Sequence, residues 1–78
     1  MDIDNLIRMA NRIGAFFAPM PDREAALAGV AEHIRKFWEP RMRRQLLEAI
    51  DAGAADALDA FVRTAVEAHR EALEPAAP

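Results

Sequence analysis

The sequence predicts an all-α fold: a single domain at 1–74 that forms a small bundle of about four short helices, with a helix–Pro–helix corner near residues 38–40. Three observations favour this fold. Apolar residues recur at the three-and-four spacing of one helix face. No window shows the sustained alternation with β-branched residues that is typical of strands. Proline, glycine or aspartate stands at each expected helix boundary. Residues 75–78 are expected to be a disordered tail.

The first two helices are expected on either side of a Pro/Met turn. The first has Asp2 or Asp4 as its N-cap and runs to about Phe17. Its apolar face consists of Ile3, Leu6, Ile7, Ala10, Ile13 and Phe17. Two prolines then end it, because a proline ring cannot continue the helical hydrogen bonds. Asp22 is the expected N-cap of the second helix. The apolar stripe of that helix is Leu27, Val30, Ile34 and Phe37.

The third and fourth helices are expected to follow the proline at position 40. Pro40 ends or kinks the second helix and opens the third, which runs to Gly53 as a left-handed C-cap. Its apolar residues are Met42, Leu46, Ala49 and Ile50. Asp56 and Asp59 are expected to open the fourth helix, which ends at Glu74. Its shared face consists of Leu58, Phe61, Val62, Ala65, His69, Ala72 and Leu73.

The composition indicates a thin hydrophobic core. Hydrophobic residues make up 53% of the 78 residues, but 18 of them are alanine, which leaves 23 larger apolar side chains. A chain this short buries only about 60% of its unfolded surface. We therefore expect a partner protein that stabilises the fold by binding it.

The residue inventory argues against an independent enzyme. The chain has no Cys, Ser or Tyr, so the usual serine and cysteine nucleophiles and thiolate metal ligands are absent. Its two histidines, His33 and His69, have no metal-binding spacing, and its three glycines are too isolated for a phosphate-binding loop. The acidic N-terminus lacks the pattern of a signal peptide, and no apolar run approaches the length of a membrane span. These features predict a soluble, cytoplasmic chain that binds no metal or cofactor itself.

Basic residues concentrate between positions 35 and 44, where the net charge is +4 although the whole chain carries −3. In the simpler interpretation of this segment, Phe37 is part of the core, Trp38 is half-buried, and the arginines form a solvated face. The alternative is a docking corner, because Trp and Arg dominate protein–protein hot spots. Its candidate residues are Phe37, Trp38, Arg41, Met42, Arg43 and Arg44. Nucleic acid is a disfavoured target, since seven acidic residues follow position 44.

A second candidate surface lies on the first helix, beside its apolar stripe. Asn5, Arg8 and Arg12 share one face, and Met9 widens the apolar area next to them. Asn11 also lies off the apolar face and is expected to be solvated or to meet a partner. Phe16 and Met20 extend the apolar surface beyond what four short helices cover, which again favours an interface.

Three stretches of the chain carry a resemblance to a known family. They are DNLIRMANRIGAFF from Asp4 to Phe17, the Pro/Met turn with the alanine-rich helix that follows, and FWEPRMRR from Phe37 to Arg44. Together they resemble the delta subunit of the soluble NAD-dependent formate dehydrogenases that contain molybdenum or tungsten. The resemblance spans nearly the whole chain and is weakest between Asp51 and Asp56.

The resemblance implies a non-catalytic accessory subunit of a cytoplasmic complex. The partner is then the large catalytic alpha subunit, which carries bis-molybdopterin guanine dinucleotide and iron–sulfur clusters, while beta and gamma subunits carry further clusters and FMN. The delta subunit supports assembly, stability or cofactor insertion. Two alternatives stay open: an independent maturation chaperone that grips the cofactor's phosphates with Arg41, Arg43 and Arg44, and a small helical nucleic-acid-binding or regulatory protein.

Overall fold

Five helices occupy most of residues 2–75, the part of the chain that the computed structural model describes. They are α1 (Ile3–Phe17), α2 (Arg23–Phe37), α3 (Pro40–Asp51), α4 (Ala60–Ala68) and α5 (Arg70–Leu73). No strand occurs in this part, so the predicted all-α class is confirmed. Of the expected tail, only Pro75 lies within the described residues.

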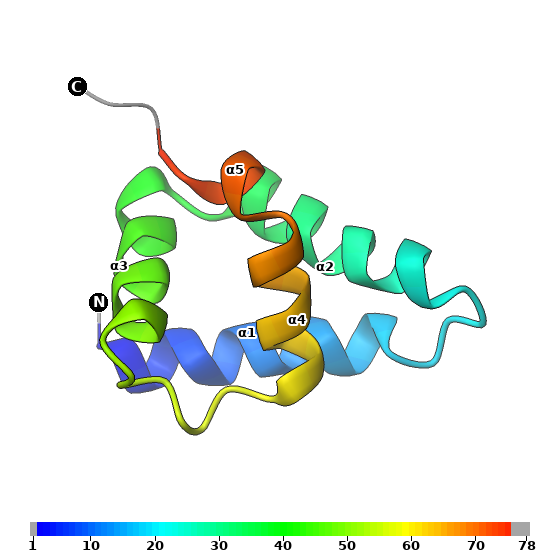
Figure 1. Cartoon of the computed structure of the whole chain (residues 1–78), viewed down its shortest axis with the longest axis horizontal. Coiled ribbons are helices and arrows are strands. Elements are labelled where there is room, and N and C mark those ends of the chain that lie inside the picture. Colours follow the sequence, from blue (N-terminus) through cyan, green and yellow to red (C-terminus); the bar gives the residue numbers. More distant parts are fainter. Residues whose placement is uncertain (1, 76–78) are drawn as a thin grey trace.

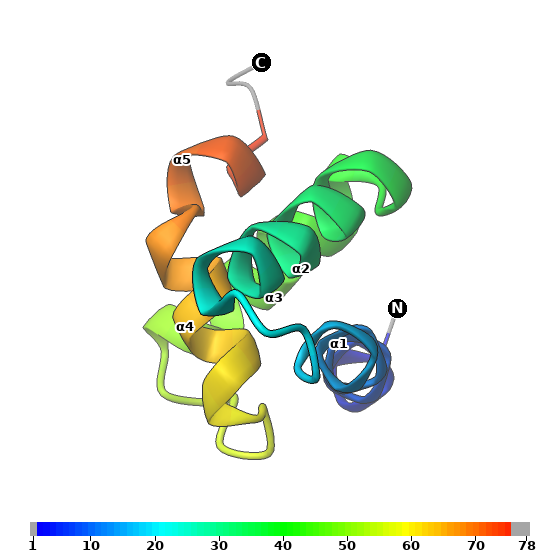
Figure 2. The same ribbon diagram turned by 90° about the vertical axis from the view of Figure 1, so that its right-hand side faces the viewer.

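The helices form two groups that pack across each other (Figure 1). α1 and α2 lie side by side, run in opposite directions and are joined by the turn at 18–22. α4 packs across both of them, and α5 continues upward from it to contact α2. α3 begins after the end of α2 and runs down to α1. Viewed from the side, α4 and α5 lie on one side of the α1–α2 pair (Figure 2).

The boundaries of the first three helices follow from local chemistry, as predicted. The Asp2 and Asp22 side chains accept hydrogen bonds from the backbone N–H groups of Asp4 and Ala25, both at 3.2 Å, and so cap α1 and α2. Pro40 occupies the first turn of α3, where its missing N–H costs no helical hydrogen bond. Gly53, just after α3, has φ of +70°, the left-handed conformation that glycine adopts without strain.

The prediction of one continuous fourth helix is wrong. The chain leaves helical geometry at His69, whose φ is −117° and ψ is 27°, and this break separates α4 from α5. The break redirects α5 so that Leu73 reaches the core and Arg70 reaches the end of α3. Asp59 is the N-cap residue of α4, whereas Asp56 lies in the preceding loop. Tertiary packing therefore overrides the helical periodicity of this segment.

The core lies between the α1–α2 pair and the other three helices. Its largest fully buried side chains are Leu6, Val30, Ile34, Leu46, Val62, Val66 and Leu73. Buried alanines at positions 10, 26, 31, 55 and 65 complete it. No charged or polar side chain of residues 2–75 is fully buried. The core is therefore apolar throughout and consists largely of aliphatic side chains.

Asn11 links α1 to the loop before α4, a role that the sequence did not indicate. Its Oδ1 accepts a hydrogen bond from the backbone N–H of Asp59 at 2.8 Å, and its Nδ2 donates to the carbonyl oxygen of Ala57 at 3.0 Å. The Asp59 side chain makes no capping hydrogen bond of its own. Asn11 thus fixes the backbone at the start of α4 from 48 residues away in sequence.

Asn11→Ala is expected to lower the free energy of unfolding by about 1 kcal/mol, because two hydrogen bonds between separate segments are lost. Urea unfolding of the isolated chain measures this change. Asn5→Ala is the matched control, since the Asn5 side chain hydrogen-bonds to Arg8 and Met9 within its own helix and its loss should cost less than about 0.5 kcal/mol. Equal effects of the two substitutions would contradict the bridging role of Asn11.

Candidate functional site

The corner between α2 and α3 has the opposite arrangement of its two aromatic residues from the one predicted. Trp38 is only 5% exposed and belongs to the core, whereas Phe37 is 71% exposed. The prediction that Trp38 is displayed to a partner is therefore wrong, and so is the burial of Phe37. The reason is that α2 ends at Phe37 and the backbone becomes extended at Trp38 and at Glu39, the residue directly before Pro40, where the helical conformation is disfavoured. This change of direction turns the indole inward.

The arginines of this corner divide into one with a structural role and two that are exposed. Arg43 donates from Nη1 to the carbonyl oxygen of Arg35 at 2.8 Å. This carbonyl lies in the last turn of α2, where carbonyl oxygens lack helical partners and attract positive charge. Arg43 thus joins α3 to α2, while Arg41 and Arg44 are exposed. Met42 is half-buried against the core.

The candidate residues of α1 separate in a similar way. Asn5 accepts a hydrogen bond from Arg8 at 3.4 Å, and its Nδ2 lies 3.7 Å from the sulfur of Met9. These three side chains interact within one helix. Arg12 is exposed one turn further along, where it lines a groove between α1 and α2. The structure therefore places Arg12, rather than the whole predicted face, beside an apolar surface.

Four aromatic rings form a row across α1 and α2, which we call the aromatic row. Its members are Phe16, Phe17, His33 and Phe37. Consecutive ring centroids are 5.1, 6.4 and 4.8 Å apart, within or close to the range of aromatic contacts. Phe16, at one end, is 78% exposed, and Phe37, at the other end, is 71% exposed. A groove of about 280 Å³ lies along the row, lined by Arg12, Ile13, Phe16, Phe17 and His33.

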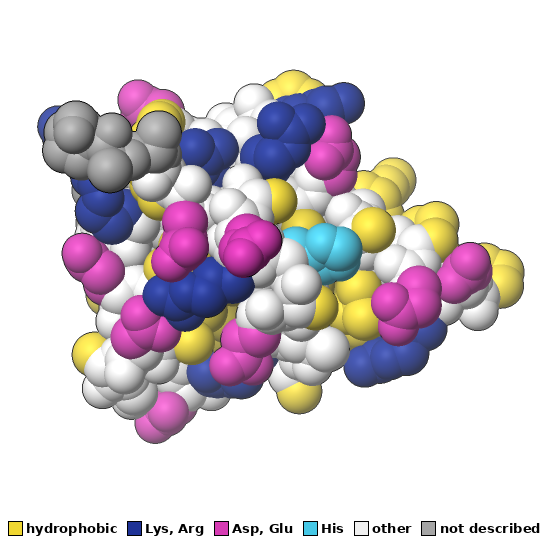
Figure 3. All heavy atoms as spheres, turned by 45° about the horizontal axis from the view of Figure 1, so that its top comes forward, with side chains coloured by type: hydrophobic (Ala, Val, Ile, Leu, Met, Phe, Trp, Pro, Cys, Tyr) yellow, Lys and Arg dark blue, Asp and Glu magenta, His cyan; other side chains and the backbone are white. Residues whose placement is uncertain are grey.

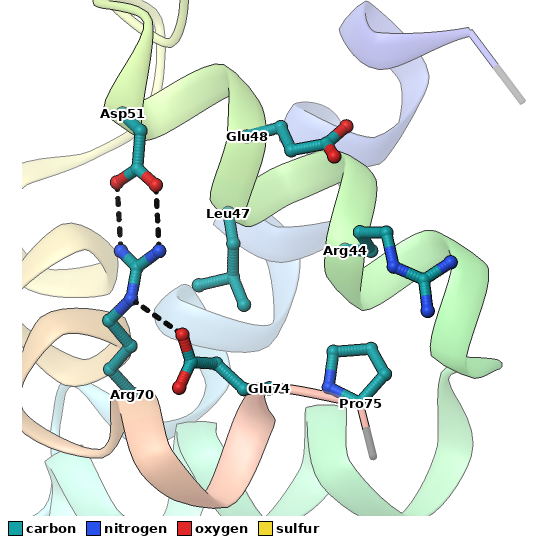
Figure 4. A pocket seen from close by; sticks show the side chains of 7 residues that line it. All are labelled: Arg44, Leu47, Glu48, Asp51, Arg70, Glu74 and Pro75. Carbon is teal, nitrogen blue, oxygen red and sulfur yellow. Dashed lines mark hydrogen bonds and ion pairs between the residues drawn. The ribbon is translucent and has the colours of Figure 1, made fainter. Parts of the chain in front are cut away.

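A second groove, between α3 and α5, is polar and is lined by an ion pair (Figure 4). The Arg70 guanidinium donates to both carboxylate oxygens of Asp51, at 2.8 and 2.7 Å, and its Nε lies 3.3 Å from Glu74. The hydrogen bonds from Arg70, followed by its positive charge, lower the pKa of Asp51 below its ordinary value of 3.8. Arg44 lines the same groove but points away from the pair. These contacts hold α5 against α3.

Arg70→Gln is expected to reduce stability at pH 7 and to make the loss of stability in acid shallower. A carboxyl whose pKa is lowered by folding stabilises the native state above its unfolded pKa, near 3.8 for Asp51. That contribution is lost as the pH falls through the lower pKa of the folded state. Thermal melts from pH 7 to pH 2 should show the difference between wild type and variant shrink below about pH 4.

Arg41→Gln, an exposed substitution on α3, is the matched control and should leave the pH dependence unchanged. A constant difference between wild type and Arg70→Gln across the whole pH range would show that Asp51 does not draw stability from Arg70.

The described residues include no metal-ligand cluster and no helix that could cross a membrane. Within 2–75, no three His, Cys, Asp or Glu side chains gather closely enough to hold a metal ion. None of the helices described has the length and apolarity needed to cross a membrane. Figure 3 shows acidic and basic side chains interspersed over one face, with apolar side chains between them. That face therefore has no single-sign field of the kind that binds a polyanion.

One comparison with known proteins gives a result. The family model of the NADH-dependent formate dehydrogenase delta subunit, FdsD, matches residues 5–66, which are most of the 78 residues. The chain belongs to the FdsD family. The resemblance seen in the sequence is thereby confirmed. No curated protein and no solved structure shows significant similarity to the chain.

The part of the chain shared with the FdsD family contains the candidate surfaces. Residues 5–66 include α2 and α3, nearly all of α1 and the first part of α4, and with them the whole aromatic row. Arg70 and α5 lie outside the matched segment. Sequence reasoning named Phe16 and Phe37 as separate interface candidates but did not find the row, because it assigned Phe37 to the α2–α3 corner and did not pair His33 with either ring.

Proposed function

We propose that this chain is a non-catalytic accessory subunit of a cytoplasmic NAD-dependent formate dehydrogenase, where it binds the large alpha subunit within a complex that includes beta and gamma subunits. The observation that carries this proposal is the match of residues 5–66 to the FdsD family. The bis-molybdopterin guanine dinucleotide, the iron–sulfur clusters and FMN then reside in the partner subunits. This chain supports assembly, stability or cofactor insertion.

Two properties of the chain support a binding role. Its core consists of alanine and a limited set of larger side chains, and such small cores rarely supply more than about 3–5 kcal/mol. A partner that binds only the folded state adds stability by mass action. The chain also leaves large apolar side chains exposed, Phe16 and Phe37 above all. A surface of this kind is typical of a subunit that is covered in its complex.

The test of binding is native mass spectrometry of the complex purified through a tag on this chain, after co-expression with the other formate dehydrogenase subunits. We expect this chain at fixed stoichiometry in a complex with the alpha subunit. Transient binding together with a bound nucleotide would instead support a maturation chaperone. Strongly salt-dependent binding of the purified chain to DNA or RNA would contradict the accessory-subunit proposal.

The test of a non-catalytic role compares complexes produced with and without this chain. We expect lower yield or molybdenum content without it, because the chain acts on the population of assembled, loaded enzyme. The formate oxidation rate per molybdenum atom should be nearly unchanged. If that normalised rate falls by about tenfold while cofactor loading stays full, the chain participates in the catalytic state, since tenfold corresponds to about 1.4 kcal/mol in the barrier.

A further inference from the structure

We propose that the aromatic row is the surface through which this chain docks onto another subunit of the complex, and that the docked segment presents apolar side chains around a carboxylate that pairs with Arg12. This inference rests on the proposed function, since it requires a partner subunit. It differs from the sequence-based docking corner because its centre lies on α1 and α2, at Phe16, Phe17 and His33.

The exposure of the aromatic row indicates that a partner covers it. The described residues include three exposed large hydrophobic side chains, and two of them, Phe16 and Phe37, are the ends of the row. Single exposed apolar residues are ordinary, but rings in contact across two helices form a continuous apolar patch. The groove beside the row provides a concave site for a partner side chain.

The exposed end of the row on α1 faces away from α4, so the fold itself leaves Phe16 open. A Cβ at Gly14 would overlap with Cγ2 of Val62, which shows that this side of α1 faces α4. Arg12 and Phe16 are each two residues from Gly14 and lie about 200° around the helix from it. His33 and Phe37 are one turn apart on α2 and continue the row. Phe17 packs against the core, so the row extends from the edge of the core at Phe17 to its exposed ends at Phe16 and Phe37.

The charges around the groove favour an acidic partner over a second copy of this chain. Arg12 lines the groove, and the described lining includes no Asp or Glu. Glu32, the neighbour of His33 in sequence, is already paired with Arg35 at 2.7 Å and Lys36 at 3.5 Å. In a two-fold dimer through this surface, the Arg12 of each copy would face the groove of the other copy. The described lining of that groove offers no carboxylate to pair with it. A carboxylate from a different protein supplies the complementary charge.

Protein is favoured over nucleic acid as the occupant for a related reason. Aromatic rings beside arginine can stack on bases, but base-stacking grooves also carry several cations that follow the phosphates. Here one arginine lines the groove, and the chain as a whole carries a net charge of −3. An apolar segment with a single carboxylate matches this arrangement better than a polyanion does.

The test measures binding of the purified full-length chain to formate dehydrogenase complex prepared without it. Phe16→Ala and Arg12→Glu should each weaken binding by about tenfold or more, as expected for residues at the centre of an interface. Glu67→Arg is the matched charge reversal on α4, at an exposed position away from the row, and should change binding by less than about threefold. Because all three positions are exposed, the isolated variants should melt like wild type.

The outcomes separate this inference from the proposed function. If wild type binds and both row variants bind equally well, the docking surface is wrong while the accessory role stands. If wild type itself does not bind the complex, both proposals fail. A photo-crosslinking residue at position 16 should crosslink to a formate dehydrogenase subunit. Crosslinking only to a second copy of this chain, or only to nucleic acid, would overturn the proposal.

Discussion

Trp38→Ala is expected to unfold a large part of the isolated chain. Trp38 is 5% exposed and is the largest side chain of the core. Replacing a buried tryptophan with alanine typically costs about 3–5 kcal/mol. A core of this size supplies about the same amount in total. Far-UV circular dichroism and urea unfolding at 25 °C should therefore show a strongly reduced helix content or a midpoint near zero denaturant.

Phe37→Ala is the control for this prediction, because it removes the neighbouring aromatic ring at a position that is 71% exposed. It should change the free energy of unfolding by no more than about 0.5 kcal/mol. Trp38, the only tryptophan, then reports unfolding of this variant by fluorescence. A folded Trp38→Ala variant together with an unfolded Phe37→Ala variant would show that the two side chains are placed the wrong way round.

The elements that could be predicted from the sequence are those with local causes. The caps at Asp2 and Asp22 act within two or three residues. Pro40 and Gly53 also act through their own backbone dihedral angles, so their effects are visible without the rest of the fold. For the same reason the spacing of apolar residues correctly indicated which face of α1 is buried.

The features that could not be predicted depend on contacts between distant segments. The break at His69 accompanies contacts that α5 makes with α2 and α3. The spacing of apolar residues within one helix does not reveal such contacts. The burial of Trp38 depends on where α2 ends. If the end of α2 shifted by one residue, Phe37 and not Trp38 would point into the core. Asn11 contacts a backbone 46 to 48 residues away, and nothing in its local sequence marks that partner.

The candidate site shows the same division between local and distant causes. From the sequence, arginine and aromatic residues, including Phe16, Arg12 and Phe37, were interface candidates. The sequence could not show that Arg43 is engaged with the end of α2, since that contact depends on the angle between two helices. The aromatic row likewise depends on the register between α1 and α2. That register places His33 between rings from two helices.

Gly14→Ala is expected to destabilise the chain by about 1–3 kcal/mol, although alanine favours helix by up to about 1 kcal/mol over glycine. At Gly14 the added methyl group would overlap with Cγ2 of Val62, a fully buried side chain at the α1–α4 contact. A packed core has little free space, so α4 must shift or Val62 must leave its preferred rotamer. Urea unfolding followed by Trp38 fluorescence measures the change.

The double variant Gly14→Ala, Val62→Ala identifies the cause. Removing the γ-methyl groups of Val62 leaves room for the new methyl group, so the double variant should be more stable than the sum of the two single effects by about 1 kcal/mol. Gly29→Ala is a useful comparison: its Cβ would approach the Phe17 ring at 2.6 Å, and this ring is only partly buried, unlike the fully buried Val62. Additive effects within about 0.3 kcal/mol would contradict a direct contact between α1 and α4 at this position.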